Sequence, residues 1–223
     1  MIPLRDVIPS RTTPYITLTI IVLNALAWLF EVSLDPRDLN QFLTVYGVVP
    51  AAFSAPTLIT SMFLHGGWMH IIGNMWYLWI FGDNVEDRLG HGRFIVFYLV
   101  CGIAAALGQV IMDPGSTLPT IGASGAIAGV MGAYFVLYPQ SRVLTLIPLI
   151  IIWEVIELPA YVLLGFWFLL QLFSAGSIAV TASSHGSGGV AFAAHVAGFL
   201  VGMAGVFVFR KREPNRWEGA DYF

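Results

Sequence analysis

Long apolar segments dominate this chain and constrain its fold more than any other feature. Six of them, each about 16 to 20 residues long, carry almost no charge. They are Tyr15–Val32, Gly67–Gly82, Phe94–Met112, Ile121–Tyr138, Leu158–Ser174 and Val190–Phe209. A helix of about 20 mostly apolar residues can cross a bilayer, where every backbone polar group must be satisfied within the protein. We therefore predict an all-α, polytopic membrane protein with a bundle of six spans.

The composition excludes several other classes of protein. Hydrophobic residues make up 57% of the chain and charged residues only 10%, against about 25% in typical soluble domains. The net charge of −3 and the lack of a basic patch indicate no nucleic-acid partner. The single cysteine, Cys101, excludes an intrachain disulfide and is expected to be a small packed residue. No Cys/His spacing resembles a zinc site, so neither a metal nor a cofactor is expected.

The basic residues predict the orientation of the spans. Nine of the ten lie before the first span, after the second, after the fourth or after the sixth, and Arg37 is the exception. These nine are Arg5, Arg11, Arg88, Arg93, Arg142, Arg210, Lys211, Arg212 and Arg216. With six spans all four places lie on one side, which the positive-inside rule makes cytoplasmic. Both termini are therefore expected in the cytoplasm.

We expect one membrane domain over residues 1–223, with a core at about 58–209 and short tails at 1–13 and 210–223. The segment Val143–Glu157 is ambiguous, because it is apolar but contains Pro148, Glu154 and Glu157. Together with the next span it is too long for one crossing. Part of it is expected in the membrane interface or against other helices, with both glutamates at the cytoplasmic surface.

Three polar side chains fall at one predicted depth. At about 1.5 Å per residue, Ser124 and His195 each lie roughly 22 Å from the cytoplasmic end of their span, and His70 lies roughly 20 Å from the end of its own. All three are in the outer third of a hydrocarbon core about 30 Å thick. Polar groups inside spans are costly, so this layer is a candidate functional site.

The layer contains the parts of a nucleophilic site. A serine hydroxyl needs a base, and His195 is the candidate base for Ser124. Small residues repeat on both spans, which predicts close packing that brings the two side chains together. They are Gly125, Gly129 and Ala133 on one span, and Ala194, Gly198 and Gly202 on the other. No acidic residue lies near this depth, so we predict a Ser–His dyad without a carboxylate.

Donors for a developing oxyanion are also present. Ser124 opens its helix, where free N–H groups and the positive end of the helix dipole favour negative charge. His70 and Asn74 are four residues apart, so they share one helix face and can both donate. Gly122 allows a tight turn in front of the serine.

Two other interpretations compete with catalysis. Small-residue motifs in membrane helices usually serve packing alone, and Gly122–Gly129 taken by itself favours that reading. A transporter would use polar groups near the midplane, in two related halves with intramembrane acids. The chain shows neither of these transporter features clearly, and the combination of three polar positions favours chemistry.

The motifs resemble those of the rhomboid intramembrane serine proteases, in the same order on the second, fourth and sixth spans. His70-Ile71-Ile72-Gly73-Asn74 resembles the family's HxxxN pair, Gly122-Ala123-Ser124-Gly125 its GxSG turn, and Ala194-His195-Val196-Ala197-Gly198 its base motif. The resemblance covers roughly residues 58–202 and implies a six-span fold of the basic bacterial form. It implies an endopeptidase for transmembrane proteins in membrane lipid, in a bacterial inner or plasma membrane, open to the extracytoplasmic side.

The resemblance also implies roles for individual residues. Ser124 would attack the peptide bond, His195 would act as base and then acid, and Gly122 and Ala123 would line the oxyanion pocket with His70 and Asn74. Two features depart from the family pattern. The segment Ser33–Pro56 has no Trp-Arg pair, and Ala128 stands where some members have a tyrosine that stacks on the base. A non-proteolytic relative that binds membrane helices is the alternative, which the presence of both Ser124 and His195 disfavours.

Overall fold

The computed structural model describes residues 1–148, 153–180 and 191–211, and this part of the chain is mostly helical. The helices are α1 Tyr15–Glu31, α2 Pro36–Tyr46, α3 Thr57–Thr60, α4 Trp68–Leu89, α5 His91–Met112, α6 Ser124–Leu137, α7 Ala160–Val180 and α8 Phe192–Phe209. Short 3-10 turns are η1 Pro50–Ala52 and η2 Ser61–Phe63, and the strands are β1 Ile2–Asp6, β2 Arg142–Pro148 and β3 Trp153–Pro159.

Each predicted apolar segment overlaps one long helix, in order α1, α4, α5, α6, α7 and α8. Among the described residues, α5 and α8 are long and apolar enough to cross a membrane by length and composition. The second segment is longer than predicted, because α4 continues past Gly82 to Leu89. Its last two turns carry carboxylates that bind the N-terminal segment. Val190, the predicted start of the sixth segment, and residues 181–189 before it lie outside the described residues.

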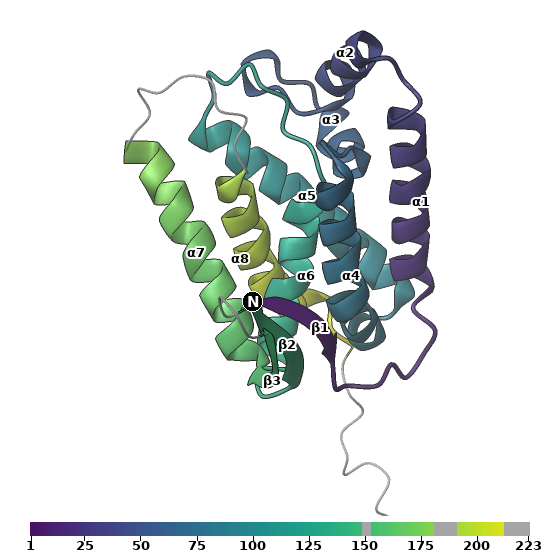
Figure 1. Ribbon diagram of the computed structural model, residues 1–223, viewed down its shortest axis with the longest axis vertical. Coiled ribbons are helices and arrows are strands. Elements are labelled where there is room, and N and C mark those ends of the chain that lie inside the picture. Colours follow the sequence, from purple (N-terminus) through teal and green to yellow (C-terminus); the bar gives the residue numbers. More distant parts are fainter. Residues whose placement is uncertain (149–152, 181–190, 212–223) are drawn as a thin grey trace, which may run out of the picture.

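Helix α6 occupies the centre of the bundle. It packs against α4, α5, α7 and α8, while α1 lies outside α4 and α7 lies on the outer side of α8 (Figure 1). Every residue from Gly125 to Tyr134 is buried. Small residues and a few large ones, such as Tyr134 and Met131, fill this core. The central position of α6 places Ser124, its first residue, where several other helices can reach it.

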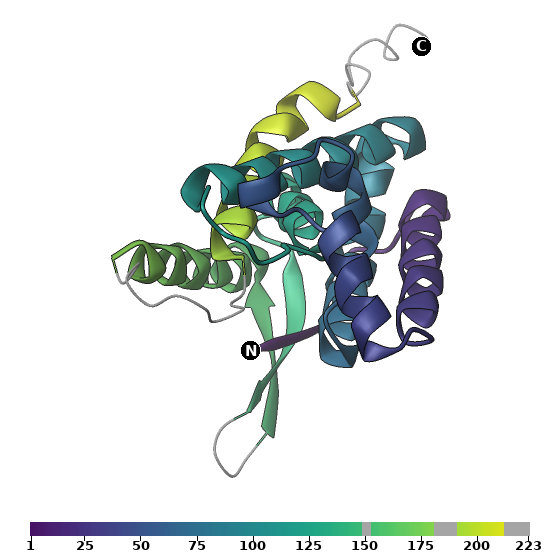
Figure 2. The same ribbon diagram turned by 90° about the horizontal axis from the view of Figure 1, so that it is seen from above.

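The prediction of a helical fold is confirmed in part. The described residues are mostly helical, but they also include a three-stranded antiparallel sheet in the order β1-β2-β3, which an all-α fold would lack. The described parts of the ambiguous segment, 143–148 and 153–157, lie in the antiparallel strands β2 and β3, which project sideways from the bundle in Figure 2. Val143 and Thr145 point to one face of β2 and are buried, as the two-residue period of a strand requires. Glu154 and Glu157 are exposed on β3. The remaining strand, β1, is formed by the N-terminal residues, and its Ile2 pairs with Leu146 of β2.

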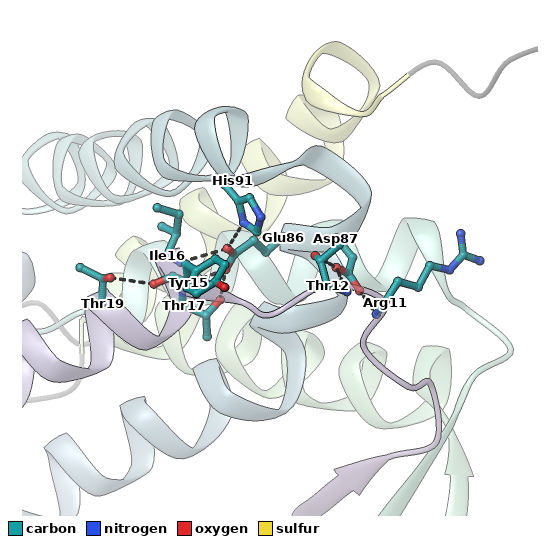
Figure 3. Close-up of polar contacts among 9 residues, drawn as sticks. All are labelled: Arg11, Thr12, Tyr15, Ile16, Thr17, Thr19, Glu86, Asp87 and His91. Carbon is teal, nitrogen blue, oxygen red and sulfur yellow. Dashed lines mark hydrogen bonds and ion pairs between the residues drawn. The ribbon is translucent and has the colours of Figure 1, made fainter.

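The N-terminal segment is held by the C-terminal end of α4, as Figure 3 shows. The buried Glu86 carboxylate accepts hydrogen bonds from the backbone N–H groups of Ile16 (2.9 Å) and Thr17 (2.8 Å) and contacts His91 Nδ1 at 2.5 Å. The N-cap residue of α1, Pro14, makes no side-chain cap. Glu86 therefore caps α1 from a neighbouring helix and ties together α1, α4 and α5.

The segment between α1 and α4 is anchored without the Trp-Arg pair. Val48 and Thr120 exchange backbone hydrogen bonds of 3.0 and 2.8 Å, and Gly122 N–H donates to the Ser61 carbonyl at 2.8 Å. These bonds attach the segment to the loop that leads into α6. The loop in front of Ser124 is thereby held by this segment at two points, Thr120 and Gly122.

Candidate active site

Ser124 and His195 meet at the interface of α6 and α8. Ser124 is the first residue of α6, and His195 lies in the first turn of α8. His195 Nε2 is 2.8 Å from Ser124 Oγ, within hydrogen-bond distance. The imidazole is largely buried, with 8% of the residue exposed. The ring nitrogen is therefore in position to accept the proton of the serine hydroxyl.

Glycines bring the two helices close enough for this contact. A Cβ added at Gly198 would lie 2.1 Å from the Gly125 carbonyl oxygen, and one at Gly202 would lie 1.9 Å from that of Gly129. Real Cβ atoms essentially never approach so closely. A Cβ at Gly125 or Gly129 would in turn collide with α5, at Ala105 or Cys101. The small-residue stripes thus pack α6 between α5 and α8.

The turn before Ser124 faces two polar side chains of α4. Gly122 has a φ of +118°, a conformation that favours glycine. A Cβ there would lie 2.7 Å from His70 Nε2 and 3.6 Å from Asn74 Nδ2, so both nitrogens approach the space beside the turn. Asn74 Nδ2 is buried and has no hydrogen-bond partner among the described residues. An oxyanion beside Gly122 would supply the missing acceptor. Ala123, between the turn and the serine, is fully buried.

A backbone group assigns the tautomer of His70. Gly66 N–H donates to His70 Nδ1 at 3.2 Å, so in the neutral ring the proton is on Nε2. That nitrogen is then a donor toward the turn at Gly122. The neighbouring His65 is buried, and its ring lies 5.0 Å from that of His70. His65 therefore supports the position of His70 by packing.

One residue of the site escaped the sequence reasoning. His195 Nδ1 is 2.8 Å from Oε1 of Gln171, on α7. Trp167, one turn earlier on α7, places its ring 5.8 Å from the imidazole at an interplanar angle of 37°. These side chains hold the ring in place of the tyrosine that is absent at Ala128. Gln171 could have been found from the sequence, because it is a polar residue within a predicted apolar span, which is the same criterion that selects Asn74.

The described residues contain no cluster of three His, Cys, Asp or Glu side chains that could hold a metal ion. Cys101 is fully buried on α5, against Gly129. The groups that the site offers are a hydroxyl with an adjacent imidazole and a set of N–H donors, which together suit acyl transfer.

Comparison with known proteins identifies a family. Residues 53–212 match the sequence model of the rhomboid family, described as Rhomboid domain. RHOMBOID-like protein 6, mitochondrial, from Arabidopsis thaliana is 29% identical over 161 residues, 72% of this chain and 46% of that protein. Putative rhomboid protease YdcA from Bacillus subtilis (strain 168) is 33% identical over 127 residues, 56% of this chain and 62% of that protein.

Rhomboid protease GluP from the same bacterium is 38% identical over 85 residues, 38% of this chain and 16% of that protein. The chain spans less than two thirds of the length of each of these three relatives.

Proposed function

This chain belongs to the rhomboid family, whose members are membrane-embedded and generally intramembrane serine proteases, and on that premise we propose that it is an active intramembrane serine endopeptidase. The observation that carries the proposal is the 2.8 Å contact between His195 Nε2 and Ser124 Oγ, beside donors from α4. A packing motif alone would not need an imidazole aimed at the serine.

The catalytic cycle follows from this geometry. His195 takes the hydroxyl proton as Ser124 Oγ attacks the carbonyl carbon of the scissile bond. The imidazolium then gives that proton to the leaving amine, and an acyl-enzyme remains. Water, deprotonated by His195, attacks the ester, and the returned proton releases the serine.

The oxyanion of each tetrahedral intermediate would lie beside Gly122. His70 Nε2–H, the Asn74 amide and the backbone N–H of Ser124 would donate to it, with Gly122 and Ala123 shaping the pocket. Each such donor contributes about 2.7–4 kcal/mol to catalysis in sites of this type. Because Gly122 has no side chain, the space beside His70 and Asn74 that a Cβ would fill is free for the oxyanion.

The proposed setting is a bilayer crossed by α1, α4, α5, α6, α7 and α8, with both termini in the cytoplasm. The distribution of Arg and Lys supports that orientation. Ser124 then lies in the outer third of a bacterial inner or plasma membrane, open to the extracytoplasmic side. The substrate would be a transmembrane protein whose helix unwinds locally, because a helical backbone hides its scissile carbonyl.

The test is covalent labelling with a fluorophosphonate, followed by cleavage of a model transmembrane substrate, in liposomes. We expect the wild type to label and cleave, and Ser124→Ala and His195→Ala to do neither. Ser33→Ala, which removes an exposed hydroxyl that bonds only its own helix end, is the matched control and should label normally. Equal labelling of Ser124→Ala would refute the proposal. Labelling of the wild type without cleavage of any membrane substrate would favour the helix-binding alternative.

A further inference from the structure

The two nitrogens of the His195 ring face two different helices. Nε2 faces Ser124 on α6, whereas Nδ1 faces the Gln171 side chain on α7, each at 2.8 Å. The imidazole thus bridges α6, at the centre of the bundle, and α7, at its periphery (Figure 1). No part of the catalytic cycle described above assigns a task to the contact with α7.

The chemistry of the contact specifies a proton position. A neutral imidazole has one N–H donor and one acceptor nitrogen, and the group on one nitrogen decides which tautomer forms. Gln171 presents its carbonyl oxygen, Oε1, to Nδ1. A carbonyl oxygen only accepts, so Nδ1 must carry the proton. Nε2 is then left with its lone pair toward the Ser124 hydroxyl, which is the form that a general base requires.

An amide suits this position better than a carboxylate. In serine proteases with a triad, an acidic side chain fixes the tautomer and orientation of the histidine. Here the site is within an apolar bundle, where an additional charge is costly. The amide supplies the same acceptor atom without that charge.

The face of α7 that carries Gln171 is built around the ring. Trp167 and Gln171 are four residues apart and so lie on one face of the helix, and both contact His195. The opposite face of α7 is apolar and exposed, with Leu169 at 61% and Phe173 at 78%. The amide is therefore turned inward, on a helix whose outer surface suits lipid.

We propose, resting on the serine-protease function above, that Gln171 is a positioning residue that holds His195 as the Nδ1–H tautomer and makes the base competent only while α7 is seated against α8. The residue acts through His195 and has no contact with the scissile bond. The position of α7 thereby becomes a requirement of catalysis as well as of packing.

Two substitutions separate this role from packing. Gln171→Met keeps the length and apolar bulk of the side chain and removes the acceptor, whereas Gln171→Glu keeps an acceptor oxygen but adds the charge that the apolar bundle disfavours. We expect Gln171→Met to lower kcat roughly tenfold or more with little change in KM, and Gln171→Glu, which keeps the acceptor, to retain more activity than Gln171→Met. A packing role predicts the opposite order. Gln109→Met, which removes an amide from α5 outside the site, is the matched control.

Two readouts complete the experiment. The rate of fluorophosphonate labelling measures the nucleophilicity of Ser124 without entry of a transmembrane substrate, and it should fall in Gln171→Met along with kcat. Nitrogen-15 NMR of histidine-labelled protein, with His195 assigned by loss of its signals in His195→Ala, should show a protonated Nδ1 in the wild type and a mixture of tautomers in Gln171→Met.

Wild-type labelling with an unchanged labelling rate in Gln171→Met would overturn this inference and leave the protease proposal standing. A wild-type signal from a protonated Nε2 would also overturn it. Failure of the wild type to label at all would instead refute the protease proposal, so the two failures are distinguishable.

Discussion

Gly198→Ala tests whether the packing of α8 on α6 sets the catalytic distance. The added Cβ would lie 2.1 Å from the Gly125 carbonyl oxygen, whereas ordinary contact begins at 3.4 Å. Backbone on both sides cannot rotate away, so α8 must move outward by the difference, about 1.3 Å (3.4 − 2.1). His195 is three residues earlier, on the neighbouring turn of the same helix. A shift of that size along the contact lengthens the 2.8 Å bond to Ser124 to about 4.1 Å, beyond hydrogen-bond distance.

The size of the effect follows from that displacement. Misplacement of a catalytic group by about 1 Å costs on the order of 100-fold in rate. Overpacking also costs about 1–3 kcal/mol of stability, so the variant should unfold at a lower temperature while remaining folded under assay conditions. The loss of activity should therefore exceed what the loss of folded protein explains.

The assay is the rate of fluorophosphonate labelling per folded molecule, with thermal unfolding followed in the same detergent. Gly73→Ala is the matched control, because it adds the same methyl group to α4 where nothing lies within 4 Å. We expect this control to label at the wild-type rate and to be equally or slightly more stable. If Gly198→Ala labels as fast as the wild type, the close approach of α6 and α8 does not set the catalytic distance, and the reasoning is wrong.

Three further predictions concern other parts of the molecule. His70→Ala and Asn74→Ala should each lower kcat on a model substrate by about 100-fold to 1,000-fold without a change in unfolding temperature. If both variants cleave at the wild-type rate, His70 and Asn74 do not bind the oxyanion. Burial raises the pKa of Asp6 to about 6, although Tyr134 donates a hydrogen bond to its carboxylate. Folded protein then binds more protons than unfolded protein between about pH 4 and 6, so the wild type loses stability as pH rises through this window. Over the same window the free energy of unfolding of Asp6→Asn, measured by chemical denaturation, should rise relative to that of the wild type by up to roughly 2 kcal/mol. A difference that does not depend on pH would contradict this. Glu86→Ala leaves buried N–H groups of α1 without an acceptor, so it should lower the free energy of unfolding by roughly 1–3 kcal/mol in the same denaturation assay. The folded fraction of this variant should still label at the wild-type rate. Unchanged stability would show that Glu86 does not cap α1.

The helices of the bundle were predictable because they depend on local composition. An apolar segment such as Phe94–Met112 forms a helix in any arrangement that keeps it out of water, since only a helix satisfies its backbone there. The ends were less predictable. Helix α4 continues to Leu89 because Glu86 and its neighbours are satisfied by the N-terminal segment, which is about 70 residues away in sequence.

The sheet could not be predicted from local pattern. Its first strand, Ile2–Asp6, is too short to indicate a partner, and its partner Arg142–Pro148 begins more than 130 residues later. A strand gains its stability from the neighbour that pairs with it, so neither sequence is informative alone. The apolar character of Val143–Glu157 gave no sign that its described parts pair as strands with each other and with the N-terminus.

For the candidate active site, too, part could be predicted from the sequence and part could not. Spacing along the sequence determined which side chains share a face and a depth, because a helix has a fixed rise and period, and this selected Ser124, His195, His70 and Asn74. Only the tertiary structure decided which groups touch. The contact of His195 with Gln171 depends on how α7 is rotated about its own axis, and that rotation is set by packing between helices, which no single segment of sequence encodes.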